Sequence, residues 1–160
     1  ALTGINSGRG KKQTFNNLTY NVNVVTLAAY IKEVGTSTGA SLNYEIFNVT
    51  SGSSLVSGTF AGTGSVGQTA KWVGIPVNVN LLTSTTYEVR LTSTAASPND
   101  WNISYTYITG DNNDARLTAL TFIGTDTFRG TITSPTNFND FNLQLFGNVY
   151  SYKSLLGVGI

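Results

Sequence analysis

The chain of 160 residues contains no histidine and no cysteine. Without imidazole or thiolate groups it cannot build a His-based catalytic triad, a cysteine nucleophile, a disulfide, or a metal site with histidine or cysteine ligands. Acid–base chemistry would fall to carboxylates, yet Glu33, Glu45 and Glu88 stand among polar residues that we expect to face outward. Such carboxylates are usually solvated. We therefore assign no catalytic residue and expect a protein that is not an enzyme and uses no cofactor.

Charged residues are also scarce. Nine lysines and arginines face eight aspartates and glutamates, so the formal net charge is +1 and charged residues make up 11% of the chain; about 25% is typical of soluble domains. Weak repulsion between copies favours self-association, which suits an assembly subunit or an extracellular module. The near balance argues against nucleic-acid binding, which needs several uncompensated cations along the phosphates.

Long apolar runs are missing as well. No window approaches the about 18 to 20 apolar residues of a membrane-spanning helix, so no membrane span is expected. In their place, threonine (24), asparagine (17), glycine (17) and serine (15) supply 73 of the 160 residues. The length suits one domain. A first residue that is alanine rather than methionine fits a mature secreted chain and a trimmed initiator methionine equally well.

Alternation of apolar and polar residues predicts strands, because successive side chains of a strand point to opposite faces. The clearest case is 87–91, where Tyr87, Val89 and Leu91 alternate with Glu88 and Arg90. The other segments with alternating or apolar sequence are 18–24, 26–34, 42–48, 55–60, 72–81, 101–107, 117–123, 127–133, 141–146 and 149–155.

Not every one of these eleven segments need form a strand of its own, and we expect an all-β fold of nine or ten strands without a convincing helix. Short strands separated by turn residues indicate a single antiparallel β-sandwich, of either the jelly-roll or the immunoglobulin-like kind. Pro76 lacks an N–H group, so its strand should lie at a sheet edge or carry a bulge.

A further pattern covers residues 42–92. It runs from Tyr44-Glu-Ile-Phe through Leu55-Val-Ser-Gly-Thr-Phe to Trp72-Val-Gly-Ile-Pro-Val, and it ends in a Leu-x-x-x-Thr-Tyr-x-Val corner that begins at Leu82. In this order the segment resembles accessory β-sandwich domains of secreted bacterial proteins and of phage virion proteins. The usual glycine of the corner is Ser84 or Thr85 here. The resemblance implies a carbohydrate-binding-like or structural sandwich, and it carries no catalytic residue.

Two tryptophans are candidates for sugar binding, which relies on aromatic faces flanked by amide and hydroxyl groups. Trp101 would have Asn99, Asp100 and Tyr105 as polar neighbours, and Trp72 is the second candidate. A buried core position is nevertheless the favoured interpretation for each tryptophan, because both open segments whose alternate positions are apolar.

Asp100, Asp111 and Asp114 could supply oxygen ligands to Ca²⁺ from neighbouring loops. Ala115 and Arg116, however, stand where the EF-hand pattern needs an acidic or amide residue and a glycine. An ordinary turn between strands is the favoured interpretation, and no metal site is assigned.

The N-terminal residues 1–12 are expected to form a flexible polar arm that precedes a sandwich domain of residues 13–160. The arm carries Arg9, Lys11 and Lys12, which could contact an acidic partner or nucleic acid, although three cations are few for the latter.

The C-terminal residues are apolar up to the last position. Leu155, Leu156, Val158 and Ile160 fit either a final strand in the chain's own sheet or a segment that pairs with a neighbouring copy.

Our leading hypothesis is a non-enzymatic structural subunit of an extracellular or virion-surface assembly, such as a coat, decoration, tail or filament protein, which self-associates through sheet edges and termini. The alternative is a carbohydrate-binding or adhesion module that uses exposed aromatic residues. The expected partners are further copies or other assembly subunits, and in the alternative case a glycan.

Overall fold

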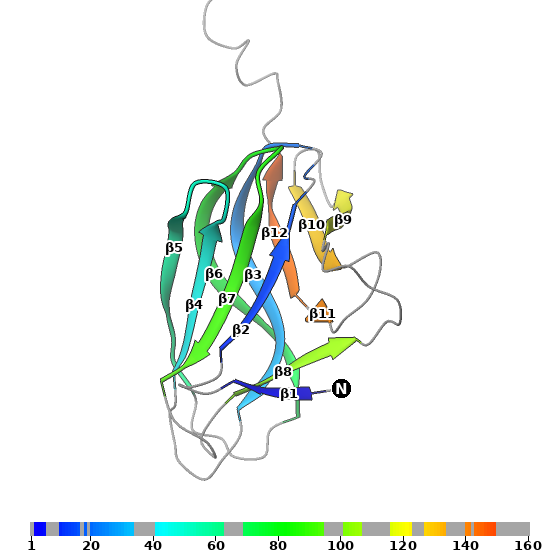
Figure 1. Ribbon diagram of the computed structural model, residues 1–160. Coiled ribbons are helices and arrows are strands. Elements are labelled where there is room, and N and C mark those ends of the chain that lie inside the picture. Colours follow the sequence, from blue (N-terminus) through cyan, green and yellow to red (C-terminus); the bar gives the residue numbers. More distant parts are fainter. Residues whose placement is uncertain are drawn as a thin grey trace, which may run out of the picture.

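The computed structural model describes eleven stretches of the chain (Figure 1). The described residues are 2–5, 10–16, 18, 20–33, 41–62, 69–94, 101–106, 116–122, 127–133, 140–141 and 143–149. For residues 2–4, 102–106, 116–122, 127–133 and 140–141 only the backbone is described.

The described residues contain twelve strands and no helix. The strands are β1 (Leu2–Ile5), β2 (Lys11–Phe15), β3 (Val22–Glu33), β4 (Leu42–Asn48), β5 (Ser53–Phe60), β6 (Lys71–Leu81), β7 (Tyr87–Ser93), β8 (Trp101–Thr106), β9 (Arg116–Phe122), β10 (Thr127–Thr133), β11 (Asp140–Phe141) and β12 (Leu143–Val149).

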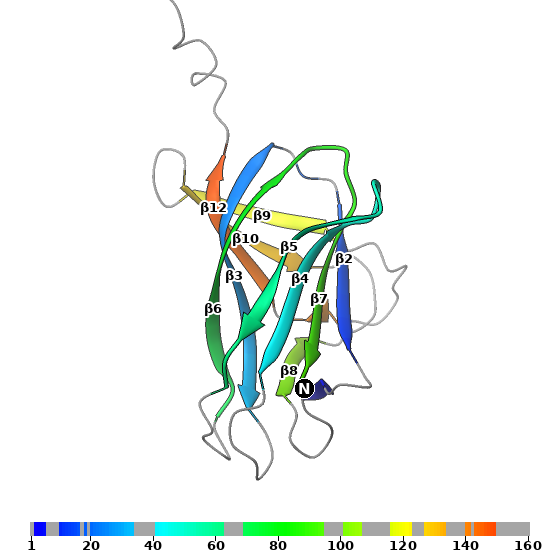
Figure 2. The same cartoon turned by 90° about the vertical axis from the view of Figure 1, so that its left-hand side faces the viewer.

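The strands form two antiparallel sheets that face each other (Figures 1 and 2). The smaller sheet has the order β2-β7-β4-β5. In the larger sheet, β3 pairs with β6 along one side and with both β12 and β8 along the other, while β10 and β9 continue beyond β12 and β1 lies beyond β8. The prediction of an all-β antiparallel fold is confirmed, and the architecture is consistent with a β-sandwich.

One hydrophobic core lies between the sheets. The alternation of β7 predicts its inner face correctly, because Tyr87, Val89 and Leu91 are all 2% exposed or less. Burial of such side chains stabilises the fold by about 1.5 to 3 kcal/mol each. The cluster also contains Ile5, Phe15, Leu18, Val22, Val24, Leu27, Ala29, Ile31, Leu42, Ile46, Ile75, Val79, Leu81, Trp101, Leu143 and Leu145.

Strand β3 joins the segments 18–24 and 26–34, which the sequence predicts as separate strands. Val22 and Val24 face the core, Val25 is 42% exposed, and the inward positions then continue from Leu27 onward. The pairing with β12 shifts register at the same place, since Phe146 and Gly147 lie opposite Thr26 and Val24. A β-bulge at Val25 therefore changes the phase of the alternation without ending the strand.

Pro76 lies on β6, which among the described strands pairs only with β3. The register between these strands also shifts beside the proline, between Val24 and Thr26 of β3. The predicted edge position is thus confirmed, and the predicted bulge is present too.

The loop before β7 is closed by a side chain. The buried Tyr87 hydroxyl accepts a hydrogen bond from the Leu82 backbone N–H at 2.7 Å. Between these residues, Ser84 has a φ of 61°, a left-handed backbone conformation that favours glycine. Of the two candidate positions for the corner glycine, Ser84 and Thr85, Ser84 thus has a backbone conformation that glycine adopts more easily.

The N-terminal part of the fold corrects one prediction. Residues 1–12 were expected to form a flexible arm, but Leu2–Ile5 pair with β8 as β1, and Lys11 and Lys12 open β2, which pairs with β7. Pairing with a neighbouring strand orders these short segments, which are too brief to show a clear alternation of their own. These two strands, with the two-residue β11, explain why the structure describes twelve strands rather than nine or ten.

The C-terminal strand boundaries differ as well. Segments 141–146 and 149–155 were predicted as separate strands, whereas β12 runs continuously through Leu143–Val149. Residues 150–160, with the apolar terminus, lie outside the described residues.

Candidate functional site

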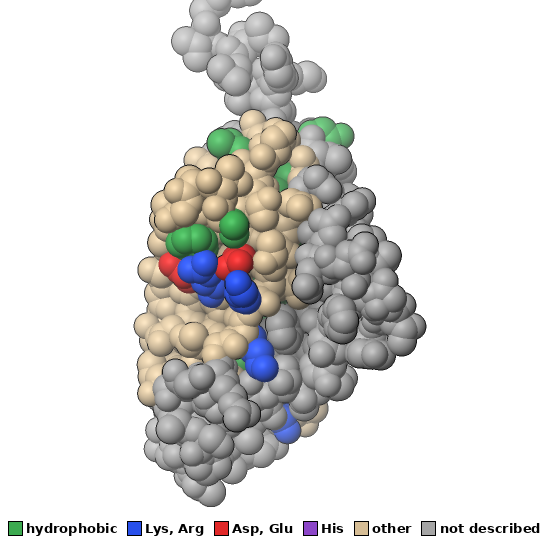
Figure 3. Space-filling model, viewed as in Figure 1, with side chains coloured by type: hydrophobic (Ala, Val, Ile, Leu, Met, Phe, Trp, Pro, Cys, Tyr) green, Lys and Arg blue, Asp and Glu red, His purple; other side chains and the backbone are tan. Residues whose placement is uncertain are grey.

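A cluster of charged side chains lies on the outer face of the smaller sheet. Figure 3 shows basic and acidic side chains gathered over β7 and its neighbours. The cluster forms because register places Arg90 of β7 opposite Lys12 of β2 on one side and Glu45 of β4 on the other. All three residues occupy outward positions of their strands.

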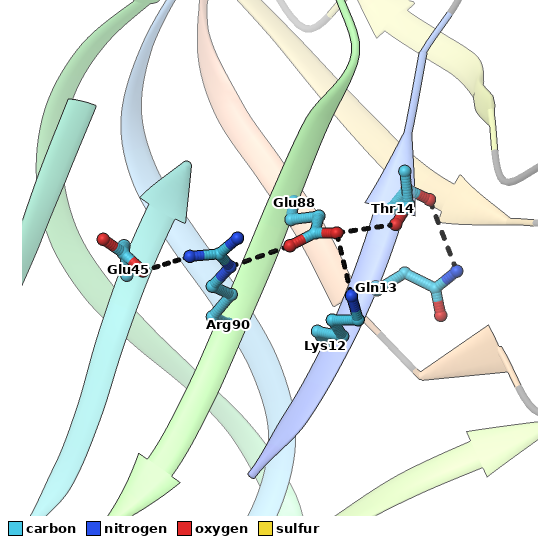
Figure 4. A network of polar contacts seen from close by, with 6 residues as sticks. All are labelled: Lys12, Gln13, Thr14, Glu45, Glu88 and Arg90. Carbon is cyan, nitrogen blue, oxygen red and sulfur yellow. Dashed lines mark hydrogen bonds and ion pairs between the residues drawn. The ribbon is translucent and has the colours of Figure 1, made fainter. Parts of the chain in front are cut away.

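Glu88 and Arg90 link the cluster across three strands (Figure 4). The Arg90 guanidinium donates from Nε to Glu88 at 2.7 Å and from Nη1 to Glu45 at 3.2 Å. The Lys12 ammonium donates to Glu88 at 3.2 Å, and the Thr14 hydroxyl donates to the same carboxylate at 3.4 Å. Two cations and two carboxylates therefore neutralise one another within one network.

The Arg90 guanidinium also lies over the Phe47 ring, 3.6 Å from its centroid. A cation stacked on an aromatic face is attracted by the ring quadrupole. Phe47 therefore helps to fix the orientation in which Arg90 reaches both carboxylates.

Glu88 is 6% exposed although its side chain points outward, because the neighbouring side chains cover it. Burial alone raises the pKa of this carboxyl, but the hydrogen bonds from Arg90 and Lys12 outweigh that effect and hold the pKa below its ordinary value. The hydrogen bond to Glu88 likewise raises the pKa of Arg90. The sequence-based expectation of a solvated Glu88 is therefore wrong.

Two surface hollows flank Arg90. One of about 430 Å³ is lined by Asn43, Tyr44, Glu45, Ser57, Gly58, Thr59, Arg90 and Thr92. The other, of about 330 Å³, is lined by Gly10, Lys11, Lys12, Arg90, Leu91 and Thr92. More of the surface of both hollows is apolar than polar, and the network that borders them carries no net charge of its own.

The two tryptophans considered as candidates for sugar binding differ sharply in exposure. Trp72 is 45% exposed and packs edge-on against Tyr30, with ring centroids 5.5 Å apart. Trp101 is 3% exposed and packs edge-on against Phe60 at 6.1 Å. The favoured core position is therefore confirmed for Trp101, which opens β8 inside the sandwich, and is wrong for Trp72, whose ring is nearly half exposed.

Nevertheless, both tryptophans contribute to one hollow of about 230 Å³ near the ends of β3, β5 and β6. Its lining residues are Ile31, Lys32, Glu33, Phe60, Lys71, Trp72, Val73 and Trp101. Glu33 is 4% exposed there, contrary to the outward position expected from its sequence. The bulge at Val25 is the reason, because it turns the odd-numbered residues of β3 inward.

The remaining predicted residues receive little structural information. Of Tyr105 only the backbone in β8 is described, whereas Lys11 and Lys12 lie on β2. The others lie outside the described residues, namely Arg9, Asn99, Asp100, Asp111, Asp114, Leu155, Leu156, Val158 and Ile160.

Sequence reasoning did not predict the charged network. The signal for Glu45, Glu88 and Arg90 was present, since all three were placed on outward faces. Lys12 was assigned to the arm, and no sequence pattern shows which strands are neighbours. Pairing across 76 residues, from Lys12 to Glu88, comes from the topology alone.

Within the described stretches, no three aspartates or glutamates lie close enough together to hold a metal ion. The same part of the chain has no helix long and apolar enough to cross a membrane.

No protein-family model and no curated protein matches the chain. The resemblance of residues 42–92 to accessory β-sandwich domains therefore stays a prediction.

Proposed function

We propose that this protein is a non-enzymatic structural subunit of an extracellular or virion-surface assembly, of the coat, decoration, tail or filament type. The observation that carries the proposal is the self-neutralised network of Lys12, Glu45, Glu88 and Arg90. In a chain with so few charges, pairing four of them with one another leaves a surface of mainly hydroxyl and amide groups. Copies of such a surface meet without strong repulsion.

The strand order supports a jelly-roll fold for this subunit. Strands β1 to β8 divide into the orders β1-β8-β3-β6 and β2-β7-β4-β5. Two interleaved Greek keys give this division, in which successive strands often change sheets. Strands β9, β10 and β12 would then be an addition that extends the larger sheet beside β3.

Light scattering of the purified chain at increasing concentration tests self-association. The average mass should rise with concentration, and it should change little between about 0.05 and 0.5 M salt, because interactions without net charge are weakly screened. A strict monomer at every concentration would overturn the proposal. Association that disappears at high salt would show that unpaired charge, rather than a neutral surface, drives it.

A second candidate function is glycan binding, favoured by the exposed Trp72 beside a hollow that also contains Phe60 and Trp101. Aromatic walls with a few polar groups suit a sugar ring. The hollow is smaller than a typical pocket for a drug-sized ligand, which suits a single ring better than a long oligosaccharide.

A glycan array probed with the full chain tests this candidate. Trp72→Ala should abolish the signal, whereas Tyr20→Ala, which removes an aromatic residue of 49% exposure that does not line the hollow, should leave it intact. Absence of any signal from the unchanged protein, or equal loss in both variants, would refute the candidate.

A further inference from the structure

The edge strands of the two sheets differ in how they are protected against pairing with another chain. Native edge strands usually carry lysine, proline or a bulge, or are very short. Strand β2 carries Lys11 and Lys12, β6 carries Lys71, Pro76 and a bulge, and β1 has only four residues. Strand β9 begins with an arginine.

Strand β5 carries neither a lysine nor a proline that would protect it. It is last in the order β2-β7-β4-β5, and among the described strands it pairs only with β4. Its sequence, Ser53–Phe60, contains no charged residue and no proline over eight residues. In Figure 2 this edge faces the viewer, with no other described strand in front of it.

A register shift divides β5 into two parts. Val56 pairs with Ile46 and Ser54 pairs with Phe47, so Leu55 is the extra residue of a bulge and is 38% exposed. The bulge interrupts the edge on the side of Ser53. It leaves a regular segment of five residues, 56–60, whose outer backbone groups can accept a further strand.

The absence of charge favours an identical strand as the partner. When an edge strand pairs antiparallel with the same strand of a second copy about a two-fold axis, every residue lies opposite a residue of that same strand. On β2 this would bring lysines together, and like charges opposite each other destabilise a sheet. On segment 56–60 only small, hydroxyl and apolar side chains would meet.

We propose that β5 of one copy pairs antiparallel with β5 of a second copy, about a two-fold axis at Gly58, and so joins the two smaller sheets into one. This inference rests on the proposed self-association and names its surface. Antiparallel neighbours must point to the same face of a sheet, which requires that residues of the same parity lie opposite each other.

The proposed register satisfies that requirement. Ser57 of one copy lies opposite Thr59 of the other on the outer face, where both side chains are exposed. Val56 lies opposite Phe60 on the inner face, where both residues already pack against the core of their own copy. Cross-strand hydroxyl pairs and apolar pairs both stabilise antiparallel sheets.

Cysteine cross-linking tests the register, because the chain has no cysteine of its own. Ser57→Cys and Thr59→Cys chains are prepared separately, mixed, and oxidised under mild conditions. The mixture should give a disulfide-linked dimer several-fold more abundantly than either variant alone, since position 57 faces position 59 and not itself. Equal cross-linking in all three samples would overturn the register.

A lysine substitution tests the surface itself. Thr59 and Thr92 flank Asn43 on the same face of the sheet and are both exposed, but Thr59 is on the edge strand and Thr92 is on the central strand β7. Thr59→Lys should raise the concentration needed for association at least tenfold, whereas Thr92→Lys should leave it unchanged.

The outcomes separate the two proposals. Loss of association in Thr59→Lys alone, in a chain whose tryptophan fluorescence shows that it is folded, supports pairing through β5. Unaltered association in Thr59→Lys overturns the β5 inference while the structural-subunit proposal stands. An unchanged protein that is monomeric at all concentrations overturns both.

Discussion

The approach of β12 to β3 gives the sharpest test of the fold. Gly147 lies opposite the bulge of β3, and a Cβ atom placed on it would overlap the carbonyl oxygen of Asn23. The same Cβ would lie 2.8 Å from the Asn23 carbonyl carbon and 2.9 Å from the Val24 Cα. We predict that Gly147→Ala destabilises the protein strongly.

The size of the effect follows from which atoms are in the way. They belong to backbone that pairs with β6 on its far side, at Asn80 and Val79, so β3 cannot move back without loosening a second strand. Overpacking of this kind costs about 1 to 3 kcal/mol, and the rigid obstacle places the cost near the upper end. Alanine also lowers the conformational entropy of the unfolded chain, which stabilises the folded state by about 0.4 to 1 kcal/mol. The net loss should be about 2 kcal/mol.

Gly74→Ala is the matched control. Its Cβ would lie 3.2 Å from the Thr26 Cγ2 atom, a methyl group that can shift, and the substitution has the same effect on the unfolded chain. Urea unfolding followed by the fluorescence of the buried Trp101 measures both variants. If the free energies of unfolding of Gly147→Ala and Gly74→Ala agree within about 0.5 kcal/mol, smaller than any effect expected from overpacking, the close pairing of β12 with β3 is refuted.

Three further predictions concern β7 and the loop before it. Because the pKa of the Glu88 carboxyl is lowered in the folded state, its contribution to stability is present above the ordinary carboxyl range near pH 4.3 and is lost as the pH falls through the folded pKa. Glu88→Gln should therefore lower the free energy of unfolding by about 1 kcal/mol at pH 7. Between pH 7 and pH 3 the free energy of unfolding of this variant should fall less than that of the unchanged protein. Equal decreases of the two proteins in urea unfolding would contradict this prediction. Tyr87→Phe leaves the Leu82 N–H without its acceptor and should lower the free energy of unfolding by about 1 to 2 kcal/mol; an unchanged urea midpoint would argue against the hydrogen bond. Ser84→Gly relieves a left-handed conformation and should raise the thermal midpoint, whereas Thr85→Gly should lower it, and a reversed order would place the strained residue elsewhere.

The strand positions could largely be predicted from the sequence because alternation is a local property. Segments 42–48, 55–60 and 87–91 match β4, β5 and β7 closely, and the edge position of Pro76 followed from its missing N–H. Prediction failed where a long-range partner decides the local structure. The short segments Leu2–Ile5 and Lys11–Phe15 are strands because β8 and β7 lie beside them.

The candidate site could be predicted only in fragments. Trp72 and Trp101 were recognised by type, but whether each ring is exposed depends on where its strand enters the sandwich. Glu33 was expected to face outward because carboxylates are usually solvated, whereas the alternation of β3 after the bulge at Val25 turns position 33 inward. A bulge has no sequence signature here beyond two adjacent valines.

The sequence by itself determined that this protein is all-β, nearly uncharged, and without imidazole or thiolate chemistry, because composition and two-residue periodicity are carried by each segment alone. Only the tertiary structure decided which strands are neighbours. That choice brings Lys12, Glu88, Arg90 and Glu45 into one neutral network and leaves β5 as an uncharged edge. The physical reason is that strand pairing depends on contacts between segments far apart in the chain, and no single segment carries the information that selects its neighbour.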